Sequence, residues 1–175
     1  MLMMPSRTAE AGDTIAVTTK LERQYEQYSV MLYRLSAVML GNRADAEDAV
    51  QNAFMRLWTK APTFRDDEHE KAWLLRVTAN ICKDMLKSAW RTKIVPLDSV
   101  ADQGEETEME PSAVLEKLFT LPPRYRSALY LHYYEGYPVR QLAKLLDAKE
   151  STAKVWLHRG RELLRLTLEG GEGDE

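Results

Sequence analysis

This sequence of 175 residues contains a single cysteine, only three histidines and no long run of apolar residues. One cysteine excludes an internal disulfide and suits a reducing compartment, so we expect a cytoplasmic protein. Cys82 stands among apolar residues of a predicted helix, which favours a buried small side chain over a reactive thiol. No segment approaches the roughly 20 apolar residues that span a bilayer. The first residues lack the apolar core of a signal peptide, so we expect neither export nor membrane insertion.

The sequence also lacks the patterns on which enzymes depend. It has no glycine-rich phosphate loop, no cluster of metal-ligand residues and no pairing of a nucleophile with a base. His69 and His132 are isolated from any metal-ligand spacing, which favours ordinary structural roles. We therefore expect a protein that is not an enzyme, with no cofactor, no metal and no small-molecule substrate.

The acidic residues are unevenly distributed, and this matters more than the formal net charge of −3. Residues 97–112 contain six acids and no base, and the tail from Glu169 contains four more acids. Without those ten, 17 acids face 24 bases, a net charge of about +7. The acidic stretch has too few apolar residues to fold alone, which predicts a flexible linker. The remaining parts are basic and therefore compatible with nucleic-acid binding.

Helical periodicity without convincing strand alternation predicts an all-α fold. Helices are expected over residues 21–40, 45–58 and 71–91, with Gly41-Asn42 and a loop over 61–67 between them, and Asp66-Asp67 can cap the third helix. Helices resume at Ala113, and residues 124–134 form a further one. The predicted organisation is a mobile extension (1–20), a helical domain (21–92), an acidic linker (93–112), a second helical domain (113–168) and an acidic tail (169–175).

The segment from Asp45 to Trp58 is the most informative part of the chain. Its apolar residues form one continuous helical stripe: Ala46, Ala49, Val50, Ala53, Phe54, Leu57 and Trp58. The opposite face carries short carboxylates and amides, an arginine and a methionine: Asp45, Glu47, Asp48, Gln51, Asn52, Met55 and Arg56. Solvated helix faces usually carry interchangeable lysines and glutamates, so this face indicates a docking surface. The alternative is an ordinary charged face of a helical bundle.

Residues 139–164 have the layout of a helix-turn-helix. A short apolar helix is followed by the turn Asp147-Ala148-Lys149 and by a second helix. This second helix turns its smaller and apolar residues inward: Ala153, Leu157, Gly160 and Leu164. Its outward face carries Ser151, Lys154, Val155, His158, Arg159 and Glu162, with Arg161 to one side. We expect Trp156 to close the edge of the core.

The chemistry of that outward face suits the major groove of DNA. Lys154 and Arg159 can donate to guanine edges or to phosphates. Ser151 and Thr152, near the start of the helix, can bind phosphate together with free backbone amides. The alternative is a structural helical hairpin with a basic, solvated surface.

Three stretches together resemble the extracytoplasmic-function (ECF) sigma factors, the smallest type of bacterial RNA polymerase sigma subunit. In order, they are GNRADAEDAVQNAFMRLW, KAWLLRVTANICKDMLKSAWR and LPPRYRSALYLHYYEGYPVRQLAKLLDAKESTAKVWLHRGRELL. The resemblance covers residues 21–92 and 113–168 and implies a sigma-2 domain followed by a sigma-4 domain. It also implies a specificity subunit that directs core polymerase to promoters and is usually held inactive by an anti-sigma factor.

The resemblance assigns roles to particular positions. The core-polymerase-binding residues would be Asp48, Gln51 and Asn52, with Phe54 and Met55 near them; the partners would be the beta-prime clamp coiled coil and, elsewhere, the beta flap. The minus-ten element of the promoter would be read by Phe64, Arg65, Asn80, Lys83, Asp84, Lys87 and Arg91. The minus-thirty-five element would be read by Ser151, Thr152, Lys154, Val155, His158, Arg159 and Arg161. For Phe64, a loop anchor packed on the core is an equal alternative to base stacking.

The sequence departs from the family pattern around the recognition helix. Asp147 stands where the turn commonly has glycine, although aspartate tolerates a left-handed backbone. Lys149 stands where many relatives place a serine cap, and Trp156 occupies a position that is often basic. These departures affect the base contacts and not the fold.

Two other functions are compatible with the sequence. A stand-alone helix-turn-helix regulator would use residues 21–92 for dimerisation or effector binding, and it would bind a twofold symmetric operator without polymerase. A helical adaptor that binds only protein would tolerate charge reversal at Lys154 and Arg159.

Overall fold

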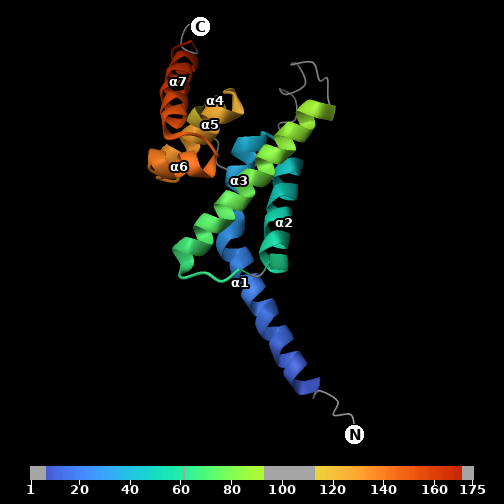
Figure 1. Cartoon of the computed structure of the whole chain (residues 1–175). Coiled ribbons are helices and arrows are strands. Elements are labelled where there is room, and N and C mark those ends of the chain that lie inside the picture. Colours follow the sequence, from blue (N-terminus) through green and yellow to red (C-terminus); the bar gives the residue numbers. More distant parts are fainter. Residues whose placement is uncertain (1–6, 61, 93–112, 171–175) are drawn as a thin grey trace.

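The computed structural model describes residues 7–60, 62–92 and 113–170, and every regular element within these ranges is helical. The expected all-α fold class is confirmed. Helices α1 (Arg7–Leu40), α2 (Arg43–Lys60) and α3 (Asp67–Thr92) pack on one another as a first unit (Figure 1). A second unit contains α4 (Ala113–Phe119), α5 (Pro123–Leu129), the π-helix η2 (Tyr130–Tyr134), α6 (Val139–Leu145) and α7 (Glu150–Glu169). The predicted linker over 93–112 lies outside the described residues.

Helix α1 begins earlier than the sequence suggested. A mobile extension was expected over residues 1–20, but the helix starts at Arg7, and its N-terminal half projects away from the rest of the molecule (Figure 1). Its residues are compatible with a helix because a lone Gly12 costs only about 1 kcal/mol and no proline interrupts. The hydroxyls of Thr18 and Thr19 each donate to a carbonyl one turn earlier, at 2.9 Å.

Local capping explains where the helices of the first unit begin and end. Gly41 follows α1 with φ of +78°, a left-handed conformation that favours glycine, and its N–H donates to the Ala37 carbonyl at 2.8 Å. Asn42 then caps α2 by accepting the Asp45 N–H at 2.9 Å. Asp66 caps α3 by accepting the His69 N–H at 2.8 Å, as its sequence position predicted.

The predicted apolar stripe of α2 forms the core of the first unit. Its residues are buried apart from Trp58, which lies at the end of the stripe, is 38% exposed and packs against Phe54 with the two rings tilted by 35° and their centroids 5.8 Å apart. The stripe packs against the buried residues of α1 and α3, among them Leu32, Leu35, Leu74, Leu75 and Cys82. Cys82 is buried, as expected, and burial raises the pKa of its thiol to about 11.

A buried polar network within the first unit was not anticipated from the sequence. The Glu70 carboxylate is 4% exposed and accepts hydrogen bonds from the Gln24 amide and from the Tyr28 hydroxyl, the latter at 3.1 Å. Both donors lie on α1 and Glu70 lies on α3. The network therefore fixes the position of one helix along the other.

The second unit contains the expected helix-turn-helix. Asp147 lies in the turn with φ of +54°, the left-handed conformation expected of it. Lys149 precedes α7 in an extended conformation and provides no side-chain cap. Gly160 brings α7 close to α5: a Cβ at this position would lie 3.0 Å from the Leu129 side chain. The single helix expected over 124–134 is divided into α5 and the π-helix η2.

The two units are in contact. Helix α5 packs beside the C-terminal part of α1, and α6 lies against α3. The buried Arg126 of α5 reaches α1 across this junction.

Candidate nucleic-acid and protein interfaces

The outer face of α2 is exposed, as its sequence predicted. Asp48, Gln51, Asn52 and Met55 all lie on the surface, and the Met55 side chain is 56% exposed. Phe54 is placed differently from these four, since it is only 1% exposed. Its ring packs against Tyr25 at 5.0 Å and Trp58 at 5.8 Å between centroids, so it supports the face from behind.

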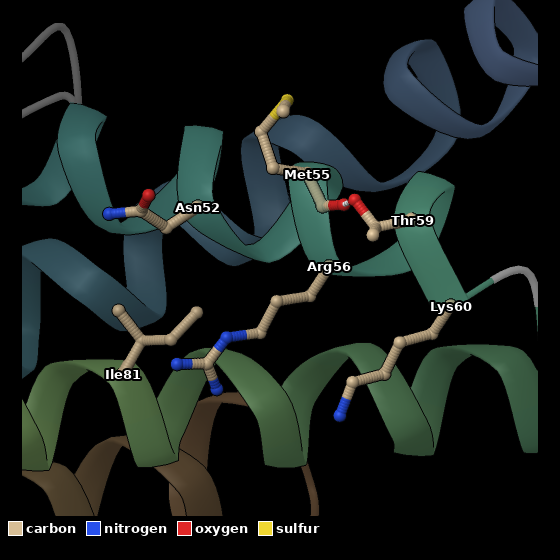
Figure 2. Close-up of a pocket in the computed structure, with 6 residues that line it drawn as sticks. All are labelled: Asn52, Met55, Arg56, Thr59, Lys60 and Ile81. Atoms are coloured by element: carbon tan, nitrogen blue, oxygen red, sulfur yellow. Dashed lines mark hydrogen bonds between the residues drawn. The ribbon is translucent and has the colours of Figure 1, made fainter.

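A shallow groove of about 370 Å³ runs between this face and α3. It is lined by Asn52, Met55, Arg56, Thr59, Lys60 and Ile81. Figure 2 shows the Arg56 and Lys60 side chains extending toward α3, while Met55 points away from it. Neither cation has an acidic partner in the described ranges. The groove is therefore positively charged.

Thr59 and Lys60 were not expected to be functional residues. The available signal was spacing: Asn52, Arg56 and Lys60 recur every four residues and so lie on one face of a helix. The Thr59 hydroxyl donates to the Met55 carbonyl at 2.6 Å, one turn earlier in α2 (Figure 2).

The loop before α3 holds Phe64 in place. The ring is half-buried and packs edge-on against His69 at 5.4 Å and against Trp73 at 5.7 Å. This is the anchor geometry, the second of the two roles considered for Phe64. Arg65 is exposed, and its backbone N–H donates to His69 Nδ1 at 3.2 Å.

The predicted minus-ten residues of α3 are only partly exposed. Asp84 and Lys87 lie on the surface, whereas Asn80 and Lys83 are half-buried. Arg91 lies within α3, but its side chain is outside the described part. Burial lowers the pKa of Lys83, and the nearby Asp147 carboxylate opposes this effect with Nζ and Oδ2 3.9 Å apart.

The recognition helix α7 presents its polar residues to solvent. Ser151, Lys154, Val155, His158, Arg159 and Arg161 are exposed and Thr152 is half-buried. Trp156 is half-buried against the core, as expected. Several of these side chains have partners nearby: Lys154 lies 3.7 Å from Glu150, His158 lies 3.3 Å from Glu162, and Arg161 donates to the Tyr133 hydroxyl at 2.7 Å.

A further cation beside α7 was missed by sequence analysis. Arg124, at the start of α5, donates to the Tyr125 hydroxyl at 3.1 Å. The hydrogen bonds from Arg124 and Arg159 to this hydroxyl lower the pKa of Tyr125. Two arginines thus converge on one phenol at the edge of the recognition helix.

No helix in the described ranges combines the length and the apolar character that crossing a membrane requires. No three histidine, cysteine, aspartate or glutamate residues in these ranges are grouped so as to hold a metal ion.

Family models match both units. The model of sigma-70 region 2 matches residues 24–92, and the model of sigma-70 region 4 matches residues 112–164. The ECF RNA polymerase sigma factor SigL of Mycobacterium tuberculosis is 29% identical over 167 residues, which cover 91% of this chain and 94% of SigL. SigM of the same species, also an ECF sigma factor, is 30% identical over 156 residues, which cover 88% of this chain and 78% of SigM.

Solved structures have the same fold. The sigma factor RpoE, crystallised with the anti-sigma factor NepR from Bartonella quintana, aligns with a TM-score of 0.66 and 22% identity over 86% of this chain and 97% of RpoE. CnrH, solved with the cytosolic domain of CnrY, aligns with a TM-score of 0.59 and 20% identity over 87% of this chain and 90% of CnrH. From the two family models in order and these relatives, we conclude that the chain belongs to the extracytoplasmic-function family of RNA polymerase sigma factors.

Proposed function

We propose that this sigma factor directs core RNA polymerase to promoters through three surfaces: α2 binds the polymerase, α3 with its preceding loop binds the minus-ten element, and α7 reads the minus-thirty-five element. The observation that carries this assignment is the presence, in one chain, of an exposed carboxylate-and-amide face on α2 and an exposed helix-turn-helix recognition face on α7.

The outer face of α2 suits a protein partner better than DNA. Asp48 is anionic, Gln51 and Asn52 can both donate and accept hydrogen bonds, and Met55 adds an adaptable apolar contact. A polar helical partner such as the beta-prime clamp coiled coil fits this chemistry. The buried Phe54 contributes by holding the helix surface in position and not by direct contact.

The groove between α2 and α3 suits a single-stranded nucleic acid backbone. Arg56 and Lys60 extend from α2 toward α3 without acidic partners in the described part of the chain, and Asn52 adds a hydrogen-bonding group. Phosphates are the natural partners of such cations. The groove adjoins the helix that carries Lys83 and Lys87, so one melted strand can follow both.

The surface of α7 suits duplex DNA. Lys154, His158 and Arg159 supply donors to base edges or phosphates, and Val155 supplies an apolar contact for a thymine methyl group. Each unit alone makes few contacts, so promoter choice requires both units on one DNA at the correct spacing. Core polymerase catalyses RNA synthesis, and the sigma factor itself catalyses no reaction.

The chain acts in the cytoplasm together with polymerase. An anti-sigma factor binds it and keeps it inactive. Support for the second statement comes from RpoE and CnrH, whose solved structures contain NepR and the cytosolic domain of CnrY.

The test is reconstituted transcription with core polymerase and a promoter library. The wild-type chain is expected to produce initiation at a defined set of promoters. Asp48→Lys should abolish core binding, whereas Glu116→Lys on the exposed surface of α4 makes the same charge change and should not. Lys154→Glu should remove dependence on the minus-thirty-five element, with Lys20→Glu on the projecting half of α1 as its control.

The same assay separates the alternatives. Initiation that is unchanged by the addition of the chain contradicts the proposal. Tight binding of a symmetric operator without polymerase indicates a stand-alone regulator. Full activity of the charge-reversed Lys154→Glu variant indicates an adaptor that binds only protein.

A further inference from the structure

Helices α5 and α7 of the second unit pack side by side (Figure 1). Gly160 of α7 permits this close approach, since a Cβ at that position would lie 3.3 Å from the Tyr125 Cβ. Tyr125 of α5 is only 6% exposed and belongs to the core, so its ring is fixed by the surrounding residues. The Tyr125 hydroxyl is therefore held at a constant place beside the recognition helix.

Two arginines, one from each helix, donate to this hydroxyl. Arg124 Nη2 lies 3.1 Å from the Tyr125 oxygen, and its Cζ lies 4.7 Å from the ring centroid, so the guanidinium also contacts the face of the ring. Arg159, the residue before Gly160 in α7, donates to the same oxygen. Both arginines are exposed. The phenol thus holds two surface cations together.

The hydrogen-bonding groups that remain in this cluster are all donors. A phenol oxygen has two lone pairs and one proton, and the two arginines occupy both lone pairs of Tyr125. The hydroxyl proton has no acceptor in the described ranges. Arg124 and Arg159 each have five N–H groups, and neither has an acidic partner in those ranges. Donors without acceptors at the surface are the chemistry that binds an anion.

The charges of the cluster also favour an anion. Elsewhere on α7 an arginine has an acid beside it, since Arg165 lies 3.9 Å from Glu169. Two guanidinium groups that bond to one oxygen repel each other, and an anion bound by both removes this repulsion. The hydrogen bonds from Arg124 and Arg159 lower the pKa of Tyr125, so its proton is a better donor to that anion.

The position of the cluster indicates which anion it binds. Arg159 lies on the exposed face of α7 that also carries Lys154 and Val155, whereas Arg124 belongs to the neighbouring helix. When a recognition helix fills a major groove, the sugar-phosphate backbones run along its sides, where a neighbouring helix can reach them. A phosphodiester has one negative charge and two free oxygens, which suit two guanidinium groups.

We infer that Arg124, the Tyr125 hydroxyl and Arg159 form a binding site for one backbone phosphate of the minus-thirty-five duplex. Tyr125 sets the distance between the two arginines and donates its own proton to the phosphate. Arg159 is thereby committed to the DNA backbone, and base reading falls to the other exposed residues of α7. The identity of the ligand rests on the proposed function, but anion binding by these three residues is a property of the free chain.

The first measurement uses the free chain and inorganic phosphate at constant ionic strength. The side-chain Nε–H NMR signals of Arg124 and Arg159 should shift together along one saturating curve, while the signal of Arg165 should scarcely move. Tyr125→Phe keeps the ring and removes the hydroxyl, so it should weaken phosphate binding roughly fivefold. Tyr133→Phe is the matched control, because it removes a hydroxyl that accepts from another arginine of α7, and it should leave phosphate binding unchanged.

The second measurement uses polymerase holoenzyme and minus-thirty-five duplexes that carry one neutral methylphosphonate linkage, placed at each position in turn. The wild type should lose roughly tenfold in affinity when one particular phosphate is neutralised. Arg124→Gln and Arg159→Gln should each bind the unmodified duplex less tightly and should no longer respond to the neutral linkage at that phosphate. Their preference among base sequences should stay as in the wild type, because phosphate contacts carry no base information. Arg165→Gln removes the same charge from α7 and should keep the wild-type response.

Three results would overturn the phosphate site. They are equal shifts of the Arg165 signal and the two other arginine signals, a wild-type response to the neutral linkage in both glutamine variants, or a changed base preference in Arg159→Gln. Selective phosphate binding by the free chain without promoter-specific initiation by the holoenzyme would instead count against the proposed function alone.

Discussion

Two buried charged side chains, one in each unit, differ in where their hydrogen-bond partners lie. Glu70 is 4% exposed, and the two side chains that donate to its carboxylate, Gln24 and Tyr28, belong to its own unit. Arg126 is 5% exposed and divides its donors between both units. A buried charge therefore has two structural roles in this protein. Glu70 joins two helices of one unit, whereas Arg126 joins the second unit to the end of α1.

The largest effect on stability is expected from Glu70→Ala. Removal of the carboxylate leaves the buried Gln24 amide without its acceptor and the Tyr28 hydroxyl with only the Asp67 carbonyl, at 3.4 Å, and an unsatisfied buried group costs about 1–3 kcal/mol. We expect a loss of roughly 3 kcal/mol in the free energy of unfolding of the first unit. Urea unfolding followed by circular dichroism measures it.

The control for this change is Glu68→Ala, an exposed residue in the same turn of α3. It should change stability by less than about 0.5 kcal/mol. Equal effects of the two substitutions would contradict the role of the buried network.

The elements of the fold were predictable where one periodic pattern determined them. The stripe from Ala46 to Leu57 is buried as its spacing required, and Asp66 caps α3 because a short carboxylate preceded a helical pattern. The turn at Asp147 was also predictable, because aspartate is one of the few residues other than glycine that adopt a left-handed backbone.

The sites were less predictable because contacts between distant segments carry no local signal. Nothing near Arg126 in the sequence indicates that it would reach Val38, 88 residues earlier. Glu70 stands among other acids of a helix start, and its burial depends on Gln24 and Tyr28 of another helix. The start of α1 at Arg7 was missed because weakly patterned residues still permit a helix when no proline interrupts.

A smaller effect is expected from alkaline pH, and it arises in the interior of the first unit. Burial raises the pKa of Cys82 to about 11, above the ordinary value of 9.0 that the unfolded chain would have. Between these values the unfolded chain loses its proton while the folded chain keeps it, so stability must fall as pH rises above about 9. Tyr28 acts in the same direction at higher pH, since burial and then Glu70 raise its pKa to about 12.

The expected loss between pH 9 and 10 from Cys82 is on the order of 1 kcal/mol. Urea unfolding of the wild type and of Cys82→Ala at both pH values measures it. The substitution should flatten the dependence on pH, even if it lowers stability at every pH through the lost contacts. A dependence that is the same in both chains would show that Cys82 does not titrate in this way.

The smallest effect concerns charges that are neither buried nor shared between units. On α7, Glu162 lies 3.3 Å from His158 and both side chains are well exposed. Exposed ion pairs are worth about 0–1 kcal/mol, so the pair scarcely stabilises the helix but keeps an acid beside a residue assigned to DNA. Glu162→Gln should therefore tighten binding of polymerase holoenzyme to minus-thirty-five duplex DNA by roughly two- to threefold.

Glu169→Gln removes an acid of the same helix beside Arg165, which is not assigned to base reading, and should leave the affinity unchanged. Equal tightening in both variants would mean that net charge alone sets the affinity, and the difference should disappear at high salt because screening weakens every surface charge, unlike the buried contacts of Glu70 and Arg126.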